Sequence, residues 1–369
     1  MRMAQEQEFR SVVLGEAQEP WNGFARLWDR SDGRSPFQSP AILRHHAVST
    51  TGVKHLFASH RNGEMHAGVV LKQDEAHDLS FLSDLKTDVN HFLFHTQAGE
   101  DERAVFFQEF LGTVKRENLT LTLNNQPGDD RTTELIVRMA DEVGLYCAML
   151  THSACPVVEA PTPEALYEHV NGLRELRYRV NKLRKQKAAV FETFTDDRDL
   201  DVWTDAFCDA HVRRWHGTAT PSNLRHPHRR IFLKGCLRAW VQDGLLVRFS
   251  VRLEEGRIGF VIGLRAPETI VHHSTTYDPR HAKSSPGKAL LLHMAEWMRD
   301  NGYRTLDFGD GREEYKYSVA NAERPLARLF IARKDNLRFI ASTSVIRAVR
   351  GNRFLSGVYE RHLKPRMKA

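Results

Sequence analysis

The clearest helical pattern in the chain runs from Lys288 to Gly302. Its apolar residues recur three and four positions apart, and they are Leu290, Leu291, Met294, Trp297 and Met298. This spacing places one apolar face on an α-helix, and Asn301-Gly302 is a typical helix stop. The pattern therefore predicts an amphipathic helix that packs on a sheet.

Strand-like segments surround this helix. Three runs separated by short turns precede it, Leu245 to Leu253, Ile258 to Ala266 and Thr269 to Asp278. A further strand, Thr305 to Phe308, follows it. We therefore expect an antiparallel meander, then a loop, then the helix and one more strand.

The first half of the chain shows the same order of elements. The helices and strands predicted there span 21–29, 40–49, 53–60, 64–72, 78–82, 101–117, 119–123, 131–143 and 145–150. Asn62-Gly63 suits the tight turn of a hairpin. The chain therefore reads as a tandem pair of α/β (α+β) units, each a mixed, largely antiparallel sheet flanked by helices.

The remaining segments set the predicted boundaries of the units. A strand over 155–159 opens the second unit, and a long helix over 163–189, a strand over 190–194 and helices over 199–215 and 225–243 follow. Residues 326–333 are expected to close the second sheet. The predicted organisation is a first unit over 1–153, a second unit over 154–335 and a tail over 336–369.

Basic residues gather in two segments of a chain whose net charge is +6. Seven of them follow Leu173 in the long helix and form either a solvated face or a wall for a phosphorylated partner. The segment from Arg324 to the end has twelve bases against two acids. The apolar positions among these bases allow a basic amphipathic helix that caps the domain or lies on an anionic membrane surface.

Several classes of protein are excluded by composition. Residues 1–20 contain no apolar run of signal-peptide length, and no stretch is apolar enough to span a bilayer. The four cysteines lack zinc-site spacing and are too few for a disulfide scaffold, so we expect reduced core residues. The 19 histidines show no recognised metal spacing. We therefore expect a cytoplasmic protein that binds no metal. Its basic tail could make peripheral contact with the inner face of the membrane.

The residues before the helix suit the binding of a phosphate group. Ser284 and Ser285 precede Pro286, Gly287 and Lys288. Ser285 is a good N-cap, Pro286 suits the first helical position, and Gly287 allows a ligand to approach the backbone. Free N–H groups and the Lys288 ammonium could bind a pyrophosphate such as that of coenzyme A, and an ordinary capped helix is the alternative.

Three carboxylates are candidates for the base that takes a proton from an attacking amine. These are Asp307, Glu313 and Asp278, because a carboxylate in a partly desolvated cleft has a raised pKa. Asp278 and its neighbour Tyr277 lie at a strand end and are also candidate substrate contacts. A structural cap or turn contact is the competing interpretation for Asp307 and Asp278.

Further polar and aromatic residues suit the transfer of an acyl group. Lys316 could face a developing oxyanion, and Tyr315 or Tyr317 could return a proton to the leaving group. Arg214-Trp215 lies in a polar loop and is a candidate substrate contact, although Trp215 could instead bury its ring at a helix end.

The segment that contains Tyr277-Asp278, Ser285-Pro286-Gly287, Asp307-Phe308 and residues 311–317 resembles the CelD-type acetyltransferases, a cellulose-biosynthesis-associated family. It is more distantly similar to the FemAB-like peptidyltransferases, which share the GNAT fold. The resemblance covers about residues 155–333. It implies two GNAT-like units, Glu313 as the first choice of base, and an aromatic–lysine pair at Tyr315-Lys316. It also raises the expectation of a polysaccharide-related role.

The resemblance implies an acyltransferase that moves an acyl group, with acetyl as the expected one, from acyl-CoA to an amine or hydroxyl of a sugar, amino sugar or amino acid. No nucleophile elbow is evident, so direct attack by the acceptor is expected. A transferase that uses aminoacyl-tRNA and a non-catalytic binding module are the alternatives. The first unit lacks a Ser-Pro-Gly helix start and is expected to bind no phosphate.

Overall fold

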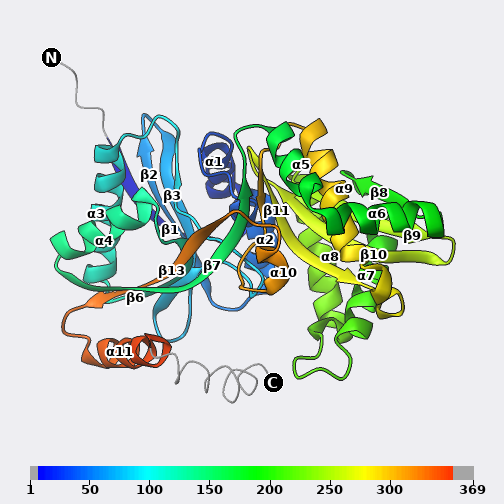
Figure 1. Ribbon diagram of the computed structural model, residues 1–369. Coiled ribbons are helices and arrows are strands. Elements are labelled where there is room, and N and C mark those ends of the chain that lie inside the picture. The colour runs from blue at the N-terminus through cyan, green and yellow to red at the C-terminus, as the bar shows by residue number, and fades with distance from the viewer. Residues whose placement is uncertain (1–6, 352–369) are drawn as a thin grey trace. The chain divides into compact units, whose positions relative to one another are not determined.

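The computed structural model describes residues 7–351, which fall into two compact units (Figure 1). The first unit contains Met1–Ser153 together with Arg324–Ala369, and the second contains Ala154–Glu323. The chain therefore leaves the first unit, builds the second and returns to the first.

The sheet of the first unit is antiparallel except at one place. Its strands, in spatial order, are β1 (Gln7–Val13), β2 (Val53–Arg61), β3 (Glu64–Gln73), β4 (Asp78–Phe81), β6 (Thr120–Pro127) and β13 (Ala322–Arg333), with β5 (Leu93–Phe94) beside β3. Strand β4 pairs in parallel with β6, and Asp78 lies opposite Thr120. Strand β13 then pairs antiparallel with β6, and Leu329 lies opposite Leu123.

Helices cover both faces of this sheet. They are α1 (Gln18–Asp29), α2 (Pro40–Ser49), α3 (Glu100–Arg116), α4 (Arg131–Glu142) and α11 (Leu337–Gly351), with the short 3-10 helix η1 (Pro36–Gln38). Successive strand residues point to opposite faces, so the contact of Gly68 with Leu27 places α1 on one face of β3. Val69 joins the core with Phe106 and Phe110 of α3 on the other face.

The second unit has the same arrangement of strands. Their spatial order is β8 (Val190–Phe194), β9 (Leu246–Leu253), β10 (Gly256–Arg265), β11 (Thr269–Tyr277), β12 (Thr305–Asp307) and the end of β7 (Leu145–Glu159). Strand β11 pairs in parallel with β12, and β12 pairs antiparallel with β7. In each unit a meander is thus followed by a helix and a parallel strand, with α3 in the first unit and α9 in the second.

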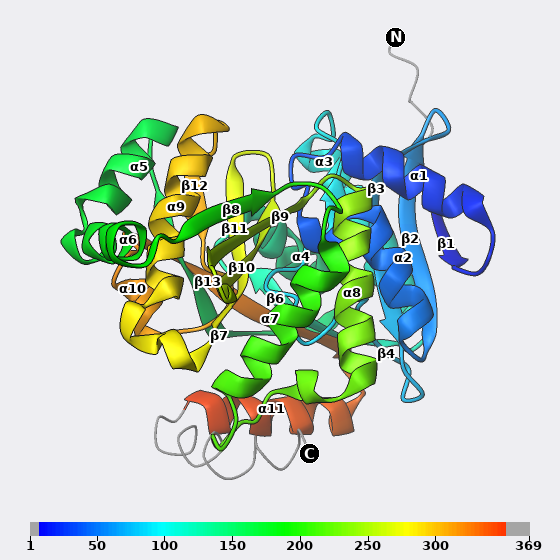
Figure 2. The ribbon, with the colours of Figure 1, turned by 90° about the vertical axis from the view of Figure 1, so that its right-hand side faces the viewer.

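Helices also cover both faces of the second sheet. They are α5 (Pro163–Gly172), α6 (Arg174–Lys187), α7 (Leu200–Arg214), α8 (Pro227–Gln242), α9 (Pro286–Asp300) and α10 (Glu314–Tyr317), with the 3-10 helices η2 (Asn223–Arg225) and η3 (Pro279–Ser284). Gly259 contacts Pro286 of α9, whereas its neighbour Phe260 packs on Trp203 of α7. Helices α9 and α7 therefore lie on opposite faces. Helices α5 and α6 pack beside α9 in both views (Figures 1 and 2).

The predicted fold class is confirmed, since each unit has a mixed, largely antiparallel sheet with flanking helices. Some boundaries were wrong. The expected helix over 163–189 is two helices, because Leu173 has an extended backbone (φ −73°, ψ 102°) directly after Gly172. Residues 326–333 do not close the second sheet, because they pair with β6 of the first unit.

Other differences concern the ends of the chain. Strand β1 was not predicted, and β7 is one continuous strand where two were expected. Of the basic tail, residues 337–351 form α11, and residues 352–369 lie outside the described residues. No helix within residues 7–351 combines the length and apolar character needed to cross a membrane.

The cysteines follow the sequence expectation in part. Cys155, Cys208 and Cys236 are buried, and Cys147 is partly buried against the core of the first unit. Burial raises the pKa of the Cys147 and Cys208 thiols to about 11. These two thiols are therefore protonated at neutral pH and suit a packing role.

Candidate active site

Helix α9 begins at a tight turn that follows η3. Ser285 has a left-handed backbone (φ 48°, ψ 56°), and Pro286 occupies the first helical position, as predicted. A Cβ on Gly259 of β10 would lie 2.7 Å from the Cβ of Pro286. The absence of a side chain at Gly259 thus allows the first turn of α9 to lie close against the sheet.

The start of α9 has unpaired amide donors. Within the described residues, no acceptor is bound to the N–H of Gly287 or Lys288, whereas Ala289 donates to the Ser285 carbonyl at 3.2 Å. Ser285 occupies the N-cap position, but its side chain makes no capping hydrogen bond. A Cβ on Gly287 would meet only the Thr275 hydroxyl, at 3.9 Å. The turn is thus chemically suited to an anionic group.

Ser284 and Lys288 were both predicted to bind the cofactor phosphate, and both have other contacts in the structure. Ser284 is buried at the end of η3, so its side chain is not presented to a ligand. The Lys288 ammonium lies 2.8 Å from both carboxylate oxygens of Glu175 on α6. Because both side chains are substantially exposed, this ion pair is weak and could exchange for a ligand phosphate.

Asp278 is paired with two arginines. Its carboxylate accepts hydrogen bonds from Arg280 and lies 3.2 Å from Arg213 of α7. The Arg280 hydrogen bond is the main cause that lowers the pKa of Asp278 to about 2, and Arg213 adds to it. The prediction of a raised pKa was therefore wrong here, and Asp278 instead joins the end of α7 to η3.

Arg214, Trp215 and Tyr277 do come together, as substrate contacts would. The Arg214 guanidinium lies 4.4 Å from the centre of the Tyr277 ring and 5.6 Å from that of Trp215. It also donates to the Thr275 carbonyl at 3.3 Å. The Trp215 indole nitrogen is buried without a hydrogen-bond partner. This group forms a cationic and aromatic wall at the end of β11.

Lys316 lies within its own loop. Its side chain is 6% exposed, and its ammonium donates to the carbonyls of Asp310 (2.8 Å) and Gly309 (3.4 Å) and pairs with Glu313 at 3.0 Å. These three partners occupy all three ammonium protons. In this arrangement the Lys316 ammonium is therefore bound by its own loop and not directed at the start of α9.

The remaining predicted groups have structural partners. The Glu313 side chain is 59% exposed, so the desolvated carboxylate that was predicted is not present. Asp307 accepts from the Gly309 N–H at 2.7 Å, which supports the competing interpretation of a turn contact. The Tyr315 ring packs near Phe308, and Tyr317 donates to Glu323 at 2.6 Å.

Strand register separates these two groups of residues. The parallel pairing of β11 with β12 ends at Val271 and Asp307. Tyr277 lies six residues further along β11, a distance of about 20 Å. The loop of Lys316 follows Asp307, whereas the start of α9 lies level with Tyr277 through Gly259. Between Val271 and Tyr277, the edge of β11 opposite β10 has no paired strand within the described residues.

His272 was not predicted as a site residue. It is buried on β11, beside Phe308 and Tyr315. Burial, and then the nearby Lys316 charge, lower the pKa of His272 to about 4. The sequence interpretation allowed a core histidine at this position, and burial confirms it. Because β11 contains several other polar residues, no sequence signal separates His272 from its neighbours.

Comparison with known protein families finds a similarity that lies in the second unit. Residues 171–317 match the family model described as the acetyltransferase (GNAT) domain. No curated protein matches the chain. The matched segment lies within the second unit and includes the start of α9 and the Lys316 loop.

Solved structures resemble the whole chain in fold. FemX is 10% identical with a TM-score of 0.61 and covers 90% of this chain and 99% of its own. The C-terminal domain of a putative lysylphosphatidylglycerol synthetase from Agrobacterium fabrum is 10% identical with a TM-score of 0.58, over 89% and 95% of the two chains. A protein of unknown function from Bacteroides thetaiotaomicron has the same identity and TM-score, over 88% and 100%. At this identity the likeness concerns fold alone.

Proposed function

We propose that this protein is an acyltransferase that moves an acyl group from acyl-CoA to an amine or hydroxyl. The observation that carries the proposal is the pair of unpaired N–H groups at Gly287 and Lys288, within a segment that matches the GNAT domain. Amide donors at a helix start bind a diphosphate, which coenzyme A contains. We assign Ser285 to Lys288 to the diphosphate, and Ser284 to the support of the turn.

The edge of β11 provides a path for the rest of the donor. From the level of Tyr277 to the level of Val271, this edge is not paired with β12. An extended amide-containing arm could add to it by main-chain hydrogen bonds, as peptides do at sheet edges. The acyl group would then lie near His272 and the loop of Lys316.

The acceptor would lie against the wall formed by Arg214, Trp215 and Tyr277. A cationic and aromatic surface suits a polyhydroxylated or carboxylated acceptor, such as a sugar, amino sugar or amino acid. The acceptor nitrogen or oxygen attacks the acyl carbon directly, the C–S bond of the thioester breaks, and the proton of the acceptor passes to the leaving thiolate, directly or through water. The pKa of Asp278 is lowered by its arginine partners and Glu313 is exposed, so we assign no general base.

A thermal-shift panel of acyl-CoAs tests this proposal. Ligand present at 100 times its Kd stabilises the folded protein by about 2.7 kcal/mol, so we expect acetyl-CoA to raise the Tm by several degrees. Gly287→Glu should abolish the shift, because its carboxylate would repel the diphosphate. Gly287→Gln is the matched neutral control and should retain most of the shift. Absence of any response across the panel would reject the proposal.

A transferase that uses aminoacyl-tRNA is the second candidate. Arg174, Arg177 and Lys185 of α6 have no ion-pair partner within the described residues, and they could contact a nucleic-acid backbone. In that case charged tRNA should bind in the presence of coenzyme A, and binding should weaken steeply with salt. Tight tRNA binding without an acyl-CoA response would favour this candidate over the first.

A further inference from the structure

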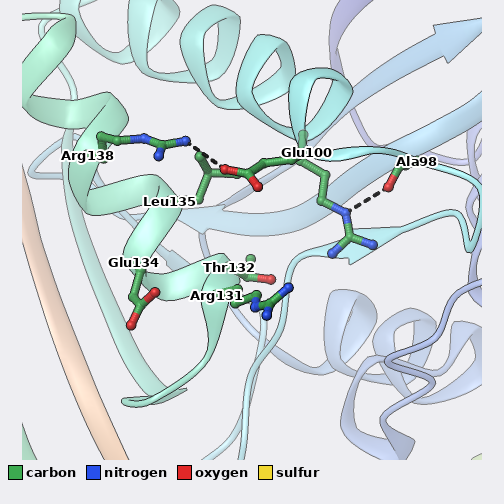
Figure 3. Close-up of a pocket in the computed structure, with 8 residues that line it drawn as sticks. Ala98, Glu100, Arg131, Thr132, Glu134, Leu135 and Arg138 are labelled. Carbon is green, nitrogen blue, oxygen red and sulfur yellow. Dashed lines mark hydrogen bonds and ion pairs between the residues drawn. The ribbon is translucent and has the colours of Figure 1, made fainter.

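A second candidate anion site lies in the first unit, outside the segment that matches the GNAT domain. A pocket of about 520 Å³ opens where α3 and α4 begin (Figure 3). Its lining includes Arg103, Arg131 and Arg138. The volume is within the range of small-molecule sites. We propose that this pocket binds a compact phosphate-type anion, such as the terminal group of a phosphomonoester.

Arg103 and Arg131 supply the positive charge. The Arg103 Nε donates to the Ala98 carbonyl at 3.0 Å, and its guanidinium lies 5.0 Å from the centre of the Phe94 ring. Its nearest carboxylate, Asp32, is 3.9 Å away. Arg131 has no ion pair or hydrogen bond within the described residues. The pocket therefore pairs one fixed guanidinium with one that is available to a ligand.

The carboxylates of the lining offset part of this charge and leave Arg131 without an ion-pair partner within the described residues. Glu100 is 3.1 Å from Arg138, and these two side chains form an ion pair at one side of the pocket (Figure 3). Glu134 forms no ion pair with Arg131, and Figure 3 shows the two side chains directed apart. The three arginines and two glutamates give the lining a net charge of +1.

The first turn of α4 adds neutral donors to the same pocket. The N–H groups of Thr132 and Thr133 have no acceptor within the described residues, and the N-cap Asp130 makes no side-chain hydrogen bond to them. The Thr132 hydroxyl also lines the pocket. These donors would add hydrogen bonds to a ligand that Arg103 and Arg131 attract by charge. The proposed site is based on these two arginines.

The acidic start of α3 explains why the anion would be bound at α4. Helix α3 occupies the place that α9 has in the second unit, but its first turn is Glu100-Asp101-Glu102. These three carboxylates disfavour a phosphate at the amide groups of α3. Glu100 also lines the proposed pocket, where it is paired with Arg138. The sequence predicted that the first unit binds no phosphate, because it lacks the Ser-Pro-Gly helix start. The proposed site departs from that prediction at the start of α4 and not at α3.

Binding of inorganic phosphate and methyl phosphate to the full chain tests the proposal. Titration calorimetry at constant ionic strength, with chloride as the reference anion, should give saturable binding of both. Arg131→Gln should weaken it about tenfold, because a hydrogen bond to a charged group is lost. Thr132→Val should weaken it about threefold. Arg26→Gln, an exposed arginine of α1 outside the pocket, should leave the Kd unchanged.

Three results would overturn this assignment. The first is no saturable binding beyond chloride. The second is an equal Kd for the unchanged chain and Arg131→Gln. The third is acetate binding as tight as methyl phosphate, which would remove the preference for phosphate. Because Gly287→Glu alters only the α9 site, phosphate binding that persists in that variant separates this site from the proposed acyl-CoA site.

Discussion

His272 makes the stability of the second unit sensitive to acid. Its folded pKa of about 4 lies below the value of about 6.5 for an unfolded chain, because the buried ring is held neutral. The stabilising contribution is therefore present above pH 6.5 and is lost as the pH falls through 4. The difference amounts to about 3 kcal/mol.

Replacement of His272 by phenylalanine should remove this acid sensitivity. We expect denaturant unfolding of His272→Phe to show a flatter loss of stability between pH 6.5 and 4 than the unchanged chain. His216→Phe replaces an exposed histidine and should retain the original pH dependence. Parallel pH profiles for all three chains would contradict the assignment of the effect to His272.

At the scale of elements, Gly259 connects the sheet to the start of α9. A methyl group there would lie 2.7 Å from the Pro286 Cβ, so β10 and the first turn of α9 would have to move apart. Such overpacking costs about 1–3 kcal/mol. We expect Gly259→Ala to lower the Tm and to weaken the response to acetyl-CoA.

Gly172→Ala is the control for this prediction. A Cβ at Gly172 meets no atom within 4 Å, and its backbone does not require glycine. This variant should keep the ligand response and a Tm close to that of the unchanged chain. An unaltered Tm and ligand response in Gly259→Ala would show that the first turn of α9 tolerates the methyl group without displacement.

Local patterns predicted the elements but not their partners. The apolar spacing from Leu290 to Met298 gave α9 correctly, and Pro286 marked its start. The break at Leu173 was missed because the helical pattern continues across it. Likewise, the sequence near Lys316 favoured a ligand contact, whereas its ammonium is bound by the carbonyls of its own loop. Such pairings depend on three-dimensional neighbours that spacing does not encode.

At the scale of the whole molecule, the chain exchanges strands between its two similar units. Strand β7 begins in the first unit and ends beside β12 of the second. Strand β13 follows the second unit in sequence but pairs with β6 of the first. Because β13 has an apolar strand pattern that suits either sheet, the sequence predicted the nearer one. The repeated order of helices and strands could thus be predicted from the sequence, whereas the return of the chain to the first unit could not.

Leu329 of β13 distinguishes the two assignments experimentally. Its side chain is fully buried in the core that contains Phe106 and Leu121 of the first unit. Leu329→Ala should therefore cost about 2–5 kcal/mol. In hydrogen exchange of the full chain, we expect protection to fall in β6 and α3 and to persist in α9. Met294→Ala, in the core of the second unit, should give the reverse pattern. Loss of protection in α9 upon Leu329→Ala would instead place β13 in the second unit, because a cavity first weakens the elements that pack around it.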